Sequence, residues 1–296
     1  MKKLAKIFTL SPALAFNVIL VYLKKAIGQK ISTGSRESGY LHYFNLLLKN
    51  NFTHLQELPT VFKVRTAGGV SLFLRKFPSS DFQVIRQIWT DKEYEVVTNL
   101  VHQYLSPGRL NIIDAGANVG YSSVYLYEAL KKKYKPFIVA VEPSDDNIAI
   151  LKMNFTENKI QDAVIEKAGL YNKTCYLDIV KEFRDGKEWS FQVQEVEYET
   201  SIKAIQPGDI LQANNWSMID FFKMDIEGAE RFLFQDGGYA RGFLDKTKII
   251  AIEIHHEYNI ADQVKSILLE NNFSFFEHGE LVIGLNKNFV SEPVTG

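Results

Sequence analysis

The chain has 296 residues, of which 46% are hydrophobic and 23% are charged. These proportions are ordinary for a folded globular protein and exclude a disordered or collagen-like chain. No internal repeat with a period of about 20–50 residues is present, which excludes a solenoid. The length suits one large α/β domain of roughly 200–250 residues together with an N-terminal extension.

Charge is distributed unevenly along the chain. The formal net charge is −1, but residues 1–30 hold six lysines and no acidic residue, so the remaining residues carry −7. Because binding to phosphates requires a basic face, this mildly acidic body argues against nucleic acid as a partner. The single cysteine, Cys175, excludes an internal disulfide and a cysteine-based zinc cluster. This cysteine content fits a reducing compartment, so we expect a cytoplasmic protein.

An apolar segment precedes the predicted domain. Ile7 to Leu23 is a run of 17 residues without a charge. As a helix it would span about 25 Å, which is marginal for crossing a bilayer, and Pro12 and Asn17 weaken such a reading. We expect residues 1–30 to form a helix that packs on the body or a partner. Peripheral attachment to the inner face of the membrane is the main alternative, and a true span or signal peptide the least favoured one.

Residues 31–90 are predicted to form the rest of the extension. Apolar residues at helical spacing indicate a helix over Tyr40–Lys49. Alternating segments at Val61–Arg65 and Val70–Arg75 flank a glycine-containing turn, which predicts a β-hairpin.

Residues 91–296 show strands and helices in alternation. The predicted helices are Asp91–Tyr104, Asn118–Lys132, Ser144–Asn158, one from Ala229, and Ala261–Asn271. The predicted strands are Asn111–Asp114, Phe137–Glu142, Ala163–Lys167, two within Thr174–Glu199, Ile219–Met224, Lys248–Ile254, and a hairpin of Phe273–Phe276 and Leu281–Leu285. This order predicts a largely parallel sheet covered on both faces. Ligands of such sheets bind at the carboxyl ends of the strands.

The first of these strands leads into a glycine loop with the spacing Asp-x-Gly-x-x-x-Gly. Gly116 lets the backbone turn tightly beside a ligand, and Gly120 lets the helix start close to it. Asp114 is unsuited to a pyrophosphate but suits a cation, such as the ammonium group of a methionine moiety. The alternative is a tight strand–helix turn with no ligand.

The next two strand ends fit an adenosine ligand. Glu142 lies 28 positions after Asp114, where a carboxylate can accept hydrogen bonds from both ribose hydroxyls. Ala168 and Gly169 would leave room for the adenine ring. The alternative for Glu142 is an acid that faces solvent at the strand end, and the alternative for Ala168 and Gly169 is a loop without a ligand.

Acidic residues and a histidine follow the later strands. Asp225 and Glu227 come directly after one strand, and Glu230 lies in the first helical turn, where an acid also favours the helix dipole. Glu253 and His255 are two positions apart, so they share a face of an extended strand. We expect Asp225, Glu253 and His255 to meet above the cofactor.

Two chemistries fit this predicted cluster. In the favoured one, His255 or Asp225 is a metal-free general base that removes a hydroxyl proton during methyl transfer. In the other, Asp225 with Glu253 or His255 binds a divalent cation that lowers the pKa of the hydroxyl. A salt-bridged structural network that includes Lys223 is the third reading.

Together these motifs resemble the FkbM family of methyltransferases over roughly residues 93–256. The resemblance rests on Glu93-Tyr94-Glu95, the loop from Asp114 to Tyr121, Val-Glu-Pro-Ser at 141–144, Lys-Met-Asp-Ile-Glu-Gly-Ala-Glu at 223–230, and Glu-Ile-His at 253–255. It implies a class I, Rossmann-like sheet of seven mostly parallel strands with an antiparallel C-terminal hairpin. It also implies S-adenosylmethionine as donor and transfer to an oxygen, often of a sugar, a glycan or a glycosylated metabolite.

The resemblance also suggests a role for each motif residue. The implied cofactor residues are Asp114, Gly116, Asn118, Gly120 and Glu142, and we add Glu95 and Ala168. The implied acceptor-side residues are Lys223, Asp225, Glu227, Glu230, Glu253 and His255. A non-catalytic adenosine-binding or scaffold protein with the same fold is the main competitor, and a nicotinamide oxidoreductase is a weaker one.

Overall fold

The computed structural model describes residues 6–32, 35–48, 52–181, 191–255 and 258–290. Its N-terminal elements are α2 (Pro12–Ala26), α3 (Arg36–Leu48), β1 (Phe52–Glu57), β2 (Val61–Thr66), β3 (Ser71–Arg75), α4 (Asp81–Trp89) and α5 (Glu95–Tyr104). The α/β part contains β4 (Arg109–Ala115), α6 (Tyr121–Leu130), β5 (Lys135–Val141), α7 (Asp145–Glu157), β6 (Ala163–Glu166), β7 (Ala168–Leu170), β8 (Tyr176–Lys181), β9 (Phe191–Val196), β10 (Ile202–Ile205), α8 (Pro207–Ala213), β11 (Ile219–Met224), α9 (Glu230–Leu233), α10 (Gly237–Leu244), β12 (Thr247–Glu253), α11 (Ala261–Glu270), β13 (Phe273–His278) and β14 (Leu281–Asn286).

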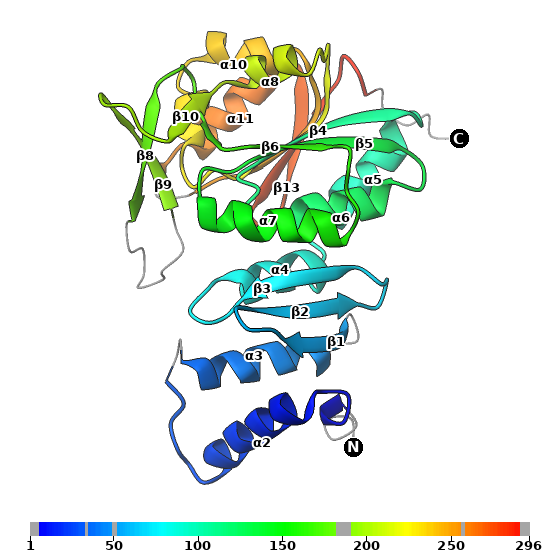
Figure 1. Cartoon of the computed structure of the whole chain (residues 1–296). Coiled ribbons are helices and arrows are strands. Elements are labelled where there is room, and N and C mark those ends of the chain that lie inside the picture. The colour runs from blue at the N-terminus through cyan, green and yellow to red at the C-terminus, as the bar shows by residue number, and fades with distance from the viewer. Residues whose placement is uncertain (1–5, 33–34, 49–51, 182–190, 256–257, 291–296) are drawn as a thin grey trace.

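The main sheet has seven strands in the order β13-β14-β12-β11-β4-β5-β6 (Figure 1). Parallel pairs join β12, β11, β4, β5 and β6, whereas β14 is antiparallel to both of its neighbours. The predicted α/β class I methyltransferase fold with an antiparallel C-terminal hairpin is confirmed. This order places the carboxyl ends of β4, β11 and β12 side by side at the centre of the sheet.

Successive residues of the central strands face opposite cores. Ile112 and Phe221 pack into one hydrophobic cluster, whereas Ile113 and Phe222 pack into the other. All four side chains are fully buried. Because a strand alternates its side chains between the two faces, a sheet covered on both faces gives apolar runs rather than a polar–apolar pattern.

A second, smaller sheet flanks the β6 edge, in the order β7-β10-β8-β9. The predicted strand over Ala163–Lys167 ends at Glu166, and Ala168 and Gly169 lie in β7 of this second sheet. The polar turn expected around residues 184–187 lies outside the described residues.

The N-terminal part has more structure than the sequence predicted. The expected hairpin is β2 and β3, but β1 adds a third antiparallel strand, and α4 follows. The burial of β1 departs from strict alternation, with Phe52 and Leu55 inward, so it lacks the period-2 signal. The apolar segment is helical from Pro12, and no helix among the described residues is long and apolar enough to cross a membrane.

A buried asparagine joins the N-terminal sheet to the α/β part. The side chain of Asn154 on α7 accepts a hydrogen bond from the Phe73 backbone N–H at 2.7 Å and donates one to the Val119 carbonyl at 2.8 Å. Nearby, the Tyr121 hydroxyl donates to the Phe73 carbonyl at 2.7 Å. These bonds satisfy β3 backbone groups that would otherwise be buried without partners.

Replacing Asn154 with alanine leaves the Phe73 N–H and the Val119 carbonyl without their side-chain partner. We expect Asn154→Ala to lower the free energy of unfolding by about 2–4 kcal/mol, measured by urea denaturation. The exposed Lys152→Ala on the same helix is the control and should change it by no more than about 0.5 kcal/mol. Equal effects of the two substitutions would contradict this role for Asn154.

Candidate active site

The loop after β4 is fixed by close backbone packing. Gly116 has a φ of +72°, and a Cβ on it would lie 1.6 Å from the Asp225 carbonyl oxygen. The backbone N–H groups of Gly116 and Ala117 both donate to the Val141 carbonyl at 3.0 Å. No residue other than glycine fits at position 116, because a side chain there would push β11 away from the loop.

A buried ion pair lies beneath this loop. Lys223 Nζ is 3.1 Å from Asp114 Oδ1, and the two side chains are 3% and 0% exposed. The hydroxyls of Ser122 and Ser123 donate to Asp114 Oδ2 at 2.7 and 2.6 Å. Asp114 is therefore surrounded by protein, which corrects the prediction that it binds the ammonium group of a methionine moiety.

Besides pairing with Asp114, Lys223 also holds the glycine loop. Its Nζ donates to the Gly116 carbonyl at 2.9 Å and lies 3.5 Å from Asp225 Oδ2. Burial by itself lowers the pKa of Lys223, but the charges of Asp114 and Asp225 outweigh it and raise the pKa above its ordinary value. Lys223 also borders the larger cavity described below, so it fixes the loop and can face a ligand as well, and its acceptor-side role stays a prediction.

Glu142 is also held by backbone groups at the end of β5. One carboxylate oxygen accepts from the Asn118 N–H at 2.9 Å, and the other accepts from the Ser144 N–H and the Asn147 amide, both at 3.0 Å. The side chain is buried, and burial raises its pKa in spite of these hydrogen bonds. Each carboxylate oxygen can accept more than one hydrogen bond, so Glu142 keeps capacity for a ligand hydroxyl.

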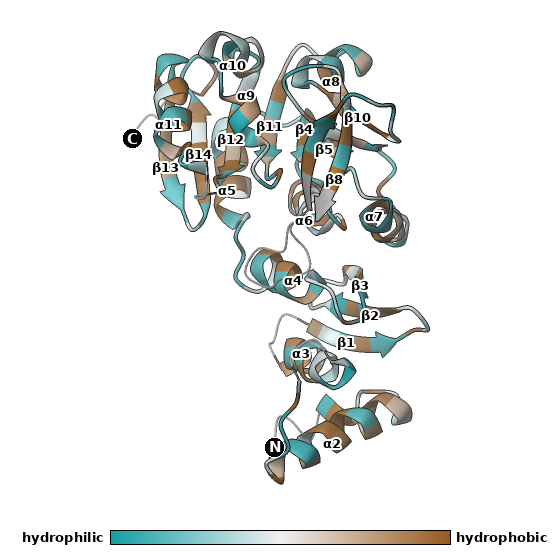
Figure 2. Cartoon of the chain, turned by 90° about the vertical axis from the view of Figure 1, so that its left-hand side faces the viewer, coloured by the Kyte–Doolittle hydropathy of each residue, from teal (hydrophilic) through white to brown (hydrophobic). Residues whose placement is uncertain are grey.

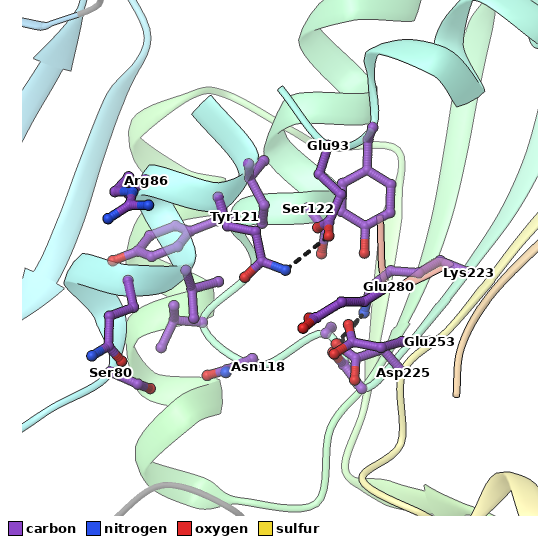
Figure 3. Close-up of a pocket in the computed structure, with 18 of the residues that line it drawn as sticks. Ser80, Arg86, Glu93, Asn118, Tyr121, Ser122, Lys223, Asp225, Glu253 and Glu280 are labelled. Atoms are coloured by element: carbon purple, nitrogen blue, oxygen red, sulfur yellow. Dashed lines mark hydrogen bonds and ion pairs between the residues drawn. The ribbon is translucent and has the colours of Figure 1, made fainter. Parts of the chain in front are cut away.

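Two adjoining cavities open at the carboxyl ends of the strands. The smaller cavity, of about 60 Å³, is lined by residues that include Glu142, Ala168 and Gly169. The larger, of about 790 Å³, lies between α4 and the strand ends (Figure 3). The two share four lining residues: Gly116, Asn118, Asp225 and Glu227. A ligand in the smaller cavity would therefore meet a ligand in the larger one beside Asp225.

The structure brings the predicted acidic cluster together at this junction. Ligating atoms of Asp225, Glu253 and His255 all lie within 4.8 Å of one another. Glu93 and Glu280 line the same cavity, and Figure 3 shows Glu280 beside Asp225 and Glu253. Burial, together with the charge of nearby Glu227, outweighs the lowering by Lys223 and His255 and raises the pKa of Asp225 to about 6. The pKa of Glu253 is also raised, by burial and by the charge of Asp225.

Comparison with known protein families matches residues 114–275 to the methyltransferase FkbM domain. This match spans more than half of the chain and contains the glycine loop, Glu142 and the acidic cluster. The chain belongs to the FkbM family. It is an S-adenosylmethionine-dependent methyltransferase, which confirms the predicted class of enzyme.

Solved structures of methyltransferases are similar to the chain at low identity and with low TM-scores. The FkbM methyltransferase from Methylobacillus flagellatus is 18% identical with a TM-score of 0.41 over 70% of this chain, and the match covers 53% of that protein. A putative rRNA methylase from Clostridium thermocellum is 11% identical with a TM-score of 0.42, covering 68% of this chain and 97% of that one. No curated protein sequence matched the chain.

Part of the larger cavity lies outside the FkbM match. Glu95 stands at the start of α5, pairs with Lys92 and is absent from the residues that line the two cavities, which corrects its prediction as a cofactor residue. Glu93 and Tyr94, immediately before the helix, line the larger cavity instead. Helix α5 begins at Glu95, the last residue of the Glu93-Tyr94-Glu95 motif, so Glu93 and Tyr94 lie in the turn before it, which directs their side chains inward.

Helix α4 supplies another wall that the sequence analysis missed. Ser80, Gln83, Val84, Gln87 and Ile88 all line the larger cavity. They are spaced three and four residues apart, as expected for one face of a helix, and Asp81 in the first turn is also typical of a helix start. The mixture of polar and apolar residues along this stripe obscured it in the sequence.

Two carboxylates favour the charged form of His255. Its Nε2 lies 3.4 Å from Glu227 and its Nδ1 lies 3.5 Å from Glu230. Burial lowers the pKa of His255, but these two carboxylates and the charge of Asp225 outweigh it and raise the pKa to about 11. A protonated imidazole cannot accept a proton, so this shift favours Asp225 over His255 as the general base, and the base stays a prediction.

The cluster also has the composition of a divalent-cation site. Two carboxylates and one imidazole form a ligand set that many transition metals accept. The Nδ1 of His255 is buried and makes no hydrogen bond of good geometry, which fits a ligand position. For coordination His255 would have to lose the proton that Glu227 and Glu230 stabilise, so a metal and a protonated His255 exclude each other at this site.

The buried pair beneath the loop gives the first test of the site. We expect Lys223→Met to lower the free energy of unfolding by about 3–5 kcal/mol, because Asp114 is left buried without its counter-charge. Thermal or urea denaturation measures the change. Lys173→Met is the matched control, because its pair with Glu195 is exposed and exposed pairs contribute little to stability. A loss as small as that of the control would contradict the supporting role.

The charge of His255 predicts a pH-dependent contribution to stability. Its folded pKa of about 11 lies above the unfolded value of about 6.5. The stabilisation is therefore complete below about pH 6.5 and is lost as the pH rises towards 11. We expect the stability gap between the wild type and His255→Gln to be larger near pH 6 than near pH 9. Exposed His278→Gln should show no such trend, and a pH-independent gap would argue that His255 is neutral.

Proposed function

We propose that this FkbM-family enzyme transfers a methyl group from S-adenosylmethionine to a hydroxyl of a sugar, a glycan or a glycosylated metabolite. The observation that carries the proposal is the meeting of the two cavities beside Asp225. One cavity offers positions suited to a nucleoside, and the other offers a polar space for an acceptor. During transfer to oxygen the acceptor hydroxyl must lose its proton, and a carboxylate at the junction is in the right place to take it.

The smaller cavity, of about 60 Å³, offers groups that suit the nucleoside end of the donor, and the rest of the donor would extend into the larger cavity. The free accepting capacity of Glu142 suits the ribose hydroxyls. Ala168 and Gly169 bring little side-chain bulk to the wall, and a Cβ on Gly169 would lie 2.5 Å from Leu177. Gly116 and Asn118 border both cavities, which is where the methionine part would pass. When bound, S-adenosylmethionine supplies an activated methyl group.

The larger cavity suits a neutral acceptor with several hydroxyls. Carboxylates of Glu93, Asp225 and Glu253 line it together with the amides of Gln83 and Gln87 on α4, and the Gln87 amide donates to Glu93 at 2.8 Å. Hydroxyl groups donate well to carboxylates and both donate to and accept from amides. Because so many acids repel another negative charge, a phosphorylated or carboxylated group near Asp225 is disfavoured.

Asp225 has the properties of the general base. It lies at the junction, 28% of its side chain is exposed, and its pKa of about 6 leaves it ionised at neutral pH. As the acceptor oxygen attacks the methyl carbon, Asp225 takes the hydroxyl proton and becomes neutral. Lys223 and protonated His255 stabilise the ionised form that precedes this step.

We expect Asp225→Asn to reduce kcat at least about 100-fold, because an amide cannot take the proton. Affinity for S-adenosylmethionine, measured by calorimetry, should change little. In the wild type, kcat/KM should fall about tenfold for each pH unit below about 6, where Asp225 is protonated. The assay is formation of S-adenosylhomocysteine with isolated glycans, with the methylated product identified by mass spectrometry.

The exposed Asp245→Asn, on the far end of α10, is the control and should keep wild-type activity. A wild-type rate in Asp225→Asn would remove Asp225 from catalysis. Loss of activity in a chelator with recovery on adding a divalent cation would favour the metal alternative over the free base. Methylation confined to amines or anionic acceptors would overturn the sugar assignment.

A further inference from the structure

Helix α2 is apolar on two opposite faces. Leu14, Val18 and Val21 are buried against the rest of the N-terminal part. A second set of large apolar side chains is exposed, and we call it the outer face of α2. It consists of Phe16, Ile19, Leu20, Leu23 and Ile27, which are 65%, 42%, 39%, 58% and 80% exposed.

The outer face is a continuous stripe. From Phe16 its members follow at intervals of three, one, three and four residues, which keeps them on one side of a helix. Figure 2 shows much of α2 in the colours of hydrophobic residues, at the end of the molecule farthest from the main sheet. Isolated exposed apolar residues are normal, but a contiguous stripe of this kind marks an interaction surface.

Positive charge surrounds this stripe. Residues 1–30 contain six lysines and no acidic residue. Lys25 and Lys30 are exposed near the C-terminal end of α2, and Lys6 lies before its N-terminal end. Lys24 pairs with Glu37 on α3, so it faces the protein rather than the stripe. An apolar stripe with lysines at both ends has the composition of helices that lie in a membrane interface.

We propose that the outer face of α2 binds the surface of an anionic lipid bilayer. The helix has 15 residues and is about 22 Å long, so it would lie along the bilayer plane with its apolar stripe below the headgroups. The lysines would contact the negatively charged headgroups. The surface lies far from the strand ends, so this binding is independent of the methyl-transfer reaction proposed above.

A second copy of the chain is a poorer occupant of this surface. A symmetric dimer would place the same patch of each copy against the other. Each copy would bring its six N-terminal lysines and no acid of that segment to compensate them. The repulsion between like charges opposes such a dimer, whereas an anionic bilayer removes it.

The test is flotation of the whole protein with lipid vesicles. We expect binding to vesicles of phosphatidylcholine mixed with phosphatidylglycerol, and at least about tenfold weaker binding to phosphatidylcholine alone or at high salt. Phe16→Ser combined with Leu23→Ser should weaken binding to the mixed vesicles at least about tenfold. Lys25→Gln combined with Lys30→Gln should also weaken binding to the mixed vesicles, but less than the Phe16 and Leu23 substitutions do.

Leu269→Ser and Phe276→Ser are matched controls, because they remove exposed apolar side chains from another part of the surface. They should leave vesicle binding unchanged, and circular dichroism should show that all variants are folded. The proposal is overturned if the wild type does not float with the mixed vesicles, or if the α2 variants float equally well. A dimer of the wild type that the α2 variants dissociate would assign the surface to a second copy instead.

Discussion

The Lys223–Asp114 pair is the interaction on which the site depends. It joins β11 to β4 below the glycine loop, and Lys223 at the same time holds the Gly116 carbonyl. With the loop fixed, the backbone of Gly116 packs directly on Asp225, which places that carboxylate at the junction of the two cavities. A buried charge pair of this kind positions groups rather than adding much net stability, because desolvation offsets most of its attraction.

The charges around the junction divide into two sets. The buried cation Lys223 and the partly buried His255, whose charged form Glu227 and Glu230 favour, stabilise ionised carboxylates. Against them, burial and mutual repulsion raise the pKa of Asp225 and Glu253. The balance gives Asp225 a pKa near 6, low enough for ionisation at neutral pH and high enough to accept a proton.

The N-terminal part contributes to the enzyme in two distinct ways. Helix α4 forms a wall of the larger cavity, so residues before the FkbM match help to define which acceptor fits. Asn154 and Tyr121 bond to β3 and thereby keep this part against the α/β domain. Helix α2, in contrast, lies at the opposite end (Figure 1) and presents apolar surface that the chain itself leaves uncovered.

The sequence by itself determined the α/β class, the glycine loop, and the meeting of Asp225, Glu253 and His255 at neighbouring strand ends. Strand–helix alternation and parallel strand order are enough for these, because carboxyl ends of adjacent strands share one edge. Only the tertiary structure decided that Asp114 faces Lys223 and that His255 faces Glu227 and Glu230. The burial and the charge state of a side chain depend on partners from distant segments of the chain, and local sequence spacing does not predict these partners. The same reason hid β1, whose place is set by packing rather than by periodicity, whereas in α4 the mixture of polar and apolar residues obscured the helical spacing.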